Sequence, residues 1–243
     1  MINITNKIKK VKSGIEGFDP LIYGGFPTER SYLISGEPGT GKTIFSLQFL
    51  LEGLRNGENA IYISIDEKPE HVINDALSLG WDLTTYLNNN QLKIIDISTF
   101  FSSNTDSGGD KLNIKKIIDK IMDYVAITKP KRLVIDPIAP LILSDTTITD
   151  VIEYIRSTIF SIESIKDCTS LLTSYIPVGS NKVSSFGVEE FATSGIIQLR
   201  LITQNNKRIR SIGVRKMRGT RIDLSEYSFD IMPERGIILR QPL

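Results

Sequence analysis

Short apolar segments alternate along the chain with longer segments in which apolar residues recur every three or four positions. The short segments are rich in β-branched residues, which is typical of buried strands. The longer segments have the spacing of amphipathic helices. The expected strands cover residues 31–35, 60–65, 92–95, 133–135 and 170–174, and the expected helices cover residues 44–54, 69–80, 114–125 and 151–162.

The last quarter of the chain has a different pattern. Residues 196–203 and 208–217 read as two strands around the turn Asn205-Asn206, and residues 237–239 read as a final strand. The alternation of strands and helices before this point predicts a parallel sheet with helices on both faces. The sequence therefore predicts an α/β fold, with a mostly parallel sheet and antiparallel C-terminal strands.

The length of the chain fits one domain. Its 243 residues suffice for one sizeable α/β core and are few for two, so residues 1–243 are assigned to a single domain. Residues 1–12 are polar and basic, and we expect a flexible end or a short pairing segment there. Residues 102–110 are polar and contain glycine, which is typical of a mobile loop.

Composition excludes some classes of protein. A net charge of +1 argues against a strongly basic nucleic-acid protein, although a local basic patch is compatible with it. We expect no membrane partner and no signal peptide, because no apolar run approaches the ~18 residues that span a bilayer. Cys168 is the only cysteine, so we expect it at the edge of the core in the reducing cytoplasm.

One glycine-rich segment has a defined chemistry. Residues 36–43 read Gly36-Glu37-Pro38-Gly39-Thr40-Gly41-Lys42-Thr43 and fit the phosphate-loop pattern G-x-x-x-x-G-K-[ST], between an expected strand and an expected helix. In such a loop, backbone N–H groups turn toward a polyphosphate. Lys42 reaches the outer phosphates and Thr43 is a ligand for Mg²⁺. The segment predicts a nucleotide phosphate site.

Carboxylates follow two of the expected strands. Asp136 can hold the water shell of the metal ion, or it can cap a turn before Pro137. Asp66 and Glu67 can orient an attacking water molecule, or they can be a solvated acidic pair near the start of the next helix. Ligands lie beyond the carboxyl ends of parallel strands, so all three carboxylates are expected at one edge of the sheet.

Two hydroxyl residues end a further strand, and one histidine stands alone. Thr173 and Ser174 can sense the outer phosphate or simply hydrogen-bond at the strand end, and the sequence leaves both readings open. His71 is the only histidine, and we expect it on the surface of a helix. A histidine-based catalytic triad or metal site therefore has no support.

Several further segments occur together in a known family. They are residues 13–19 (SGIEGFD), 80–83 (GWDL), 187–191 (GVEEF) and 216–220 (KMRGT). With the phosphate loop and the strand-end carboxylates, they make the chain similar to KaiC-like ATPases of the RecA superfamily, from about Ser13 to the C-terminus. The KMRGT segment is much more specific than the phosphate loop. The chain resembles one KaiC domain, and the archaeal branch of the superfamily includes paralogues of the recombinase RadA.

This resemblance implies a fold, an activity and an assembly. The implied fold is a RecA-like core, and the implied activity is ATP hydrolysis with Mg²⁺. The implied assembly is a ring, commonly a hexamer, with ATP at each subunit interface. Lys216 and Arg218 match the cations that reach the γ-phosphate bound by the neighbour, where they would stabilise charge. Without the resemblance they read as a solvated basic stripe with Arg208, Arg210 and Arg215.

The chain departs from the family pattern at three places. Asp66 stands where the family usually has the glutamate that activates water, and a carboxylate displaced by one methylene can cost heavily in rate. Glu67 can partly compensate. Pro137 stands where the family has a hydroxyl residue. Glu189 and Glu190 occupy the region that resembles the phosphorylation site of the clock protein, so autophosphorylation is not expected.

Three functional hypotheses follow. The first is an ATP-binding ring ATPase that uses Lys42, Asp66, Glu67, Lys216 and Arg218. The second is a RadA-paralogue accessory of DNA recombination or repair that binds single-stranded DNA or a recombinase, through loops 138–147 and 176–187. These loops carry a single cation, Lys182, which argues for weak DNA binding. The third is a nucleotide-gated scaffold for a protein partner with slow or absent turnover.

Overall fold

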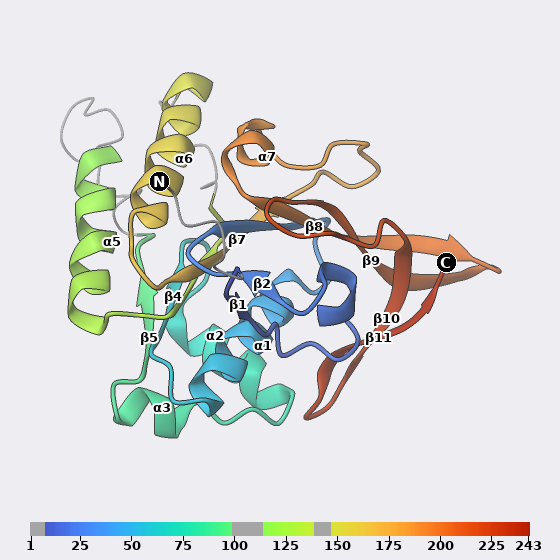
Figure 1. Ribbon diagram of the computed structural model, residues 1–243, viewed down its shortest axis with the longest axis horizontal. Helices are drawn as coiled ribbons and strands as arrows, with labels where there is room; N and C mark the ends of the chain where they lie inside the picture. Colours follow the sequence, from blue (N-terminus) through green and yellow to red (C-terminus); the bar gives the residue numbers. More distant parts are fainter. Residues whose placement is uncertain (1–7, 99–113, 139–146) are drawn as a thin grey trace.

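The computed structural model describes residues 8–98, 114–138 and 147–243. A nine-stranded β-sheet forms the centre of this part of the protein (Figure 1). Neighbouring strands are parallel from β8 to β5 and antiparallel from β8 to β11. Across the sheet the strands are β11 (Gly236–Pro242), β10 (Glu226–Met232), β9 (Lys207–Met217), β8 (Gly195–Gln204), β3 (Ser31–Gly36), β7 (Thr169–Tyr175), β6 (Arg132–Asp136), β4 (Ala60–Ser64) and β5 (Leu92–Asp96).

Helices cover both faces of the sheet, as Figure 1 shows. One face packs against α1 (Lys42–Arg55), α2 (Pro69–Ser78) and α3 (Thr84–Asn88). The other face packs against α5 (Ile114–Thr128), α6 (Ile148–Glu163) and α7 (Val188–Ala192). Side chains of a strand alternate between faces, so each central strand contributes to two cores. In β3, for example, Ile34 belongs to the α1 side and Leu33 to the α6 side.

The expected fold class is confirmed, and the elements differ from expectation in detail. The mostly parallel sheet, its flanking helices and the antiparallel C-terminal strands are all present. Strand β10 was not expected, because Phe229 is its only fully buried residue and the segment lacks a compact apolar run. Cys168 is buried and belongs to the apolar cluster on the α6 side of the sheet. The loop expected at residues 102–110 lies outside the described residues.

The N-terminal segment is paired where it is described. Strand β1 (Lys10–Val11) pairs with β2 (Phe26–Pro27), which precedes β3 and follows the short 3₁₀ helix η1 (Asp19–Ile22). The Lys10 ammonium donates to the carbonyl oxygens of Ile22 and Tyr23, each at 2.9 Å. The alternative of a short pairing segment therefore holds for Lys10–Val11. Residues 1–7 lie outside the described part.

A buried arginine joins this N-terminal segment to the core. Arg132 begins β6, and its side chain is 2% exposed. Its guanidinium donates to Glu58 at 2.6 Å and to the carbonyl oxygens of Lys12 and Phe49 at 2.7 and 2.8 Å. The guanidinium also stacks over the Phe49 ring. A buried cation is tolerated only when such partners replace water.

Replacing Arg132 should therefore destabilise the fold. We expect Arg132→Leu to lower the free energy of unfolding by about 3 kcal/mol, because Glu58 and two carbonyl oxygens lose their donor. Urea denaturation measures this change. Lys131→Ala is the matched control, because the Lys131–Asp167 ion pair is exposed and should contribute under about 1 kcal/mol. Equal stability of the two variants would contradict this role of Arg132.

Candidate nucleotide site

A cavity lies beyond the carboxyl ends of the parallel strands. Strands β3, β4, β6 and β7 end side by side, so the residues that follow them meet at one edge of the sheet. The cavity has a volume of about 490 Å³. Its lining residues are Pro38, Gly39, Gly41, Lys42, Thr43, Ile44, Glu67, Asp75, Ser78, Leu79, Asp136, Tyr175, Arg210 and Ile231.

The phosphate loop connects β3 to α1, as expected. Gly41 has a φ of 105° at the N-cap of α1, a conformation that side chains with a Cβ rarely adopt. At Gly36, a Cβ would lie 2.6 Å from the Leu199 carbonyl oxygen, so the close approach of β8 requires glycine. Thr40 donates to the Glu37 carbonyl oxygen at 2.8 Å and closes the turn. The open N-terminus of α1 then faces the cavity, and such an end favours anions.

Lys42 lies at the floor of the cavity. Its ammonium donates to the carbonyl oxygens of Gly36 at 2.9 Å and Glu37 at 3.0 Å, and it lies 4.7 Å from the centre of the Tyr175 ring. Burial lowers the pKa of Lys42 to about 8, while the negative charge of Asp136 acts in the opposite direction. A buried ammonium held by neutral carbonyl oxygens is well placed to bind an anion.

Asp136 accepts hydrogen bonds from three hydroxyl groups. Thr43 Oγ1 donates to Asp136 Oδ2 at 2.8 Å, and the Tyr62 hydroxyl donates to the same oxygen. Thr173 Oγ1 donates to the other oxygen, Oδ1. The carboxylate therefore has a fixed orientation beside the phosphate loop. Mg²⁺ is usually held by one or two such protein oxygens together with phosphates and water, so Thr43 and Asp136 fit this ion.

Asp66 and Glu67 follow β4 at the same edge. Glu67 lines the cavity, and Asp66 is hydrogen-bonded to the Tyr175 side chain. Burial raises the pKa of the Asp66 carboxyl, and the charge of Asp136 adds to this effect against the hydrogen bond from Tyr175. The pKa of Glu67 is raised by burial first and then by Asp136. Glu67 and Asp136 thus line one cavity, and Asp66 is near enough for the charge of Asp136 to raise its pKa. A cation there would be favoured.

Thr173 and Ser174, which the sequence could not tell apart, face opposite sides of the sheet. Thr173 contacts Asp136 on the side of the phosphate loop. The Ser174 hydroxyl instead donates to Glu189 Oε1 at 3.0 Å, beneath α7. Of the two, therefore, only Thr173 contacts Asp136.

Lys216 and Arg218 lie apart from the described residues that line this cavity. Both are near the C-terminal end of β9, where the Lys216 ammonium donates to the carbonyl oxygens of Glu190 and Thr193, each at 2.7 Å. Burial lowers the pKa of Lys216, and the positive charge of Arg218 lowers it further. The Arg218 side chain is exposed. The chain therefore does not bring these cations to its own phosphate loop.

The cavity also contains residues that the sequence analysis missed. Tyr62 was hidden in an apolar strand, where a tyrosine reads as a core residue. Tyr175, one residue beyond the expected strand, covers Lys42 and holds Asp66. Arg210 was assigned to a solvated basic stripe, but its guanidinium lies 3.4 Å from the Gly39 carbonyl oxygen. Strand alternation places Arg208 and Arg210 on the same face of β9, so the sequence held no signal that singled out Arg210.

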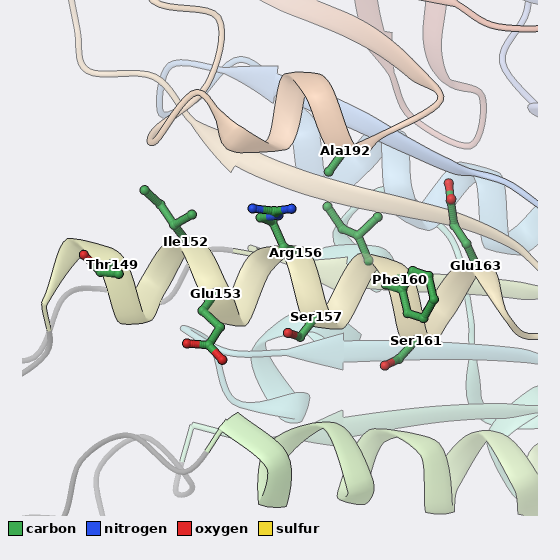
Figure 2. A pocket seen from close by; sticks show the side chains of 10 residues that line it. Thr149, Ile152, Glu153, Arg156, Ser157, Phe160, Ser161, Glu163 and Ala192 are labelled. Carbon is green, nitrogen blue, oxygen red and sulfur yellow. The ribbon is translucent and has the colours of Figure 1, made fainter.

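A second hollow, of about 700 Å³, lies on the outer face of α6 beside Ala192 of α7 (Figure 2). Arg156, Glu163 and Phe160 are among its lining residues. Phe160 is 80% exposed, and Phe191 on α7 is 79% exposed. The charge of Glu163 also raises the pKa of Lys216, against the lowering by burial and by Arg218. Two exposed aromatic rings beside charged groups are typical of a protein interface.

Other classes of site find no support in the part of the chain that is described. His71 is exposed on α2, as expected. No group of three or more histidine, cysteine, aspartate or glutamate side chains is arranged to hold a metal ion there. Within the same ranges, every helix is too short or too polar to cross a membrane.

Comparison with known proteins identifies the family. Residues 11–243 match the model of the KaiC ATPase family, so the chain belongs to that family. It is 35% identical over 241 residues to the circadian clock oscillator protein KaiC of Prochlorococcus marinus, covering 98% of this chain and 46% of that protein. The chain thus spans about half the length of the clock proteins that it matches.

Two further relatives match over nearly their full length. A UPF0273 protein of Pyrococcus horikoshii is 33% identical, with 95% of this chain and 94% of that protein covered. The crystal structure of a KaiC-like protein from the same species has a TM-score of 0.83 at 32% identity, and covers 97% of this chain and 100% of that one. These matches confirm the KaiC-like resemblance and its RecA-like fold, while the RadA-paralogue subtype stays a prediction.

The role of the hydroxyl groups that donate to Asp136 can be tested by mutation. Thr173→Val keeps the shape of the side chain but removes one donor to the carboxylate. Because hydrogen bonds to a metal ligand tune its affinity, we expect the Mg²⁺ concentration for half-maximal binding of a fluorescent ATP analogue to rise about tenfold. Thr158→Val, a buried threonine of α6 on the other face of the sheet, is the control. An equal Mg²⁺ requirement in both variants would contradict the assigned role.

Proposed function

We propose that the chain is a Mg²⁺-dependent ATPase whose sites are completed between subunits of a ring. The observation that carries this proposal is the 2.8 Å contact between Thr43 and Asp136 beside the phosphate loop. Gly36, Glu37, Pro38, Gly39, Thr40, Gly41, Lys42 and Thr43 would bind the phosphates of ATP. Membership of the KaiC ATPase family supports the same assignment.

The reaction would be hydrolysis of the γ-phosphate. The oxygen of a water molecule attacks the γ-phosphorus as the bond to the β-phosphate oxygen breaks, giving ADP and phosphate. Mg²⁺ held by Thr43 and Asp136 would neutralise charge on the β- and γ-oxygens. Asp66 and Glu67 orient the water and accept its proton, and their raised pKa values suit proton transfer. Lys42 stabilises the charge on the phosphates.

Turnover is expected to be slow. The Asp66 carboxylate is one methylene shorter than glutamate, and Tyr175 holds it by a hydrogen bond. Glu67, which lines the cavity, is the second candidate for orienting water. The short Asp66 side chain also favours a second function, the nucleotide-gated scaffold. In that function, ATP binding stabilises a ring that binds another protein. In that case ATP would be bound without measurable turnover.

The DNA-binding hypothesis has less support. Loop 176–187 carries Lys182 as its only lysine or arginine, and residues 139–146 of the other loop lie outside the described ranges. Nonspecific affinity for DNA depends mainly on cations that contact phosphates. Binding of single-stranded DNA or a recombinase stays a prediction from the sequence.

Assembly would place Lys216 and Arg218 at the site of a neighbouring subunit. They lie away from the phosphate loop of their own chain, so they can act at an ATP site only across an interface. Phe191 supports a second copy of the chain as the partner, because this exposed ring lies between Glu190 and Thr193, whose carbonyl oxygens hold Lys216. Such a head-to-tail contact generates a ring when its rotation closes, and a hexamer is the number that we propose.

Mixing two inactive variants tests the shared site. Lys216→Ala removes the donated cation, and the double variant Asp66→Asn, Glu67→Gln removes the water-orienting carboxylates but keeps the phosphate loop. We expect each variant alone to lose at least about 100-fold in steady-state ATP turnover. In an equal mixture prepared before ATP is added, about a quarter of the sites pair intact carboxylates with an intact lysine, which restores activity.

The outcomes separate the alternatives. Recovered turnover in the mixture supports a site shared between subunits. Two further mixtures are the controls for subunit exchange. Each combines Lys42→Ala, which should not bind ATP, with Lys216→Ala or with the double variant. If the Lys216→Ala mixture stays inactive although mixed oligomers form, Lys216 does not act in trans. Native protein that binds ATP but hydrolyses none would favour the scaffold function.

A further inference from the structure

The family segment at residues 187–191 has no part in the reaction proposed above, yet it makes specific contacts. Residues 188–191 lie in α7, and Glu189 is completely buried. Glu189 Oε1 accepts hydrogen bonds from Ser174 Oγ at 3.0 Å and from the Phe186 backbone N–H at 3.4 Å. Glu189 Oε2 has no hydrogen-bond partner among the described residues. A purely structural anchor would not need a buried carboxylate oxygen, which is costly to leave unpaired.

Ser174 joins this carboxylate to the nucleotide site. Its neighbour on β7 is Thr173, which donates to Asp136 on the opposite face of the sheet. The backbone of these two residues is fixed in the sheet, because Thr173 and Ser174 pair with Ile34 and Ser35 of β3, and the Thr173 carbonyl oxygen accepts from the Ile138 N–H at 2.9 Å. The end of β7 is therefore a rigid support. Thr173 donates to Asp136 at the nucleotide cavity, and Ser174 holds α7 through Glu189.

The other end of α7 holds Lys216. The Lys216 ammonium donates to the carbonyl oxygens of Glu190 and Thr193, which are on either side of the exposed Phe191. The Thr193 hydroxyl donates in turn to the Glu189 carbonyl oxygen at 2.7 Å. Because α7 has only five residues, a change in how Glu189 is held would shift both carbonyl oxygens and the lysine that they hold.

We propose that Ser174 and Glu189 are positioning residues for Lys216. They fix α7 on the end of β7, and α7 holds the Lys216 ammonium where it can serve the ATP site of the neighbouring subunit. Ser174 and Glu189 would thus act on the ATP site of the neighbouring subunit and not on the ATP site of their own chain. This inference rests on the proposed function, in which Lys216 acts in trans.

The test uses Ser174→Ala, which deletes one hydroxyl group from a buried position. We expect ATP turnover to fall at least about tenfold, as for a misplaced catalytic group, while a fluorescent ATP analogue binds as tightly as to the native protein. Mixing with the double variant Asp66→Asn, Glu67→Gln should restore turnover to the level that Lys216→Ala regains in the same mixture. Ser170→Ala is the matched control, because this buried serine lies at the start of the same strand and its side chain contacts Cys168. It should retain native turnover.

Each alternative outcome is distinct. Native turnover in Ser174→Ala would overturn the inference. So would a mixture in which Lys216→Ala is rescued but Ser174→Ala is not, because Ser174 would then act in its own site. If Lys216→Ala itself is not rescued, the trans site fails and this inference falls with it. Glu189→Leu removes the other partner of the same bond and gives the same test if Ser174→Ala does not fold.

Discussion

The arrangement of the site depends on one carboxylate, Asp136, and the hydroxyl groups bound to it. Thr43 comes from the start of α1, Tyr62 from β4 and Thr173 from β7. These contacts fix three elements around the end of β6, and they compensate a carboxylate that is 8% exposed. The same contacts aim the carboxylate at the phosphate loop. Stability and chemistry therefore depend on the same hydrogen bonds.

The two faces of the sheet have different roles in this account. The α1 face carries the phosphate loop and the carboxylates that would act on ATP. The α6 face carries α7, the exposed rings of Phe160 and Phe191, and the carbonyl oxygens that hold Lys216. Strand β7 connects them, because successive side chains point to opposite faces. In the assembly proposed above, a subunit would bind one nucleotide with one face and complete a second site from the other.

The sequence predicted the parallel core and the phosphate loop because both depend on local patterns. Periodic apolar residues mark strands and helices, and the spacing of Gly36, Gly41 and Lys42 defines the loop. Contacts between elements that are far apart in the sequence could not be predicted from local patterns. The role of Tyr62 depends on its position beside Asp136 of the neighbouring strand β6. The different roles of Thr173 and Ser174 depend on which face of the sheet each side chain points to. The contact of Arg210 depends on how β9 passes the phosphate loop. Strand β10 was missed because it is only half buried.

The most direct test of the central claim is steady-state ATP turnover by the native chain, measured with and without Mg²⁺. We expect slow but measurable turnover that requires Mg²⁺ and disappears in the double variant Asp66→Asn, Glu67→Gln, while that variant still binds ATP. Turnover that persists in the double variant, or that is independent of Mg²⁺, would contradict the assignment of these carboxylates and of Asp136.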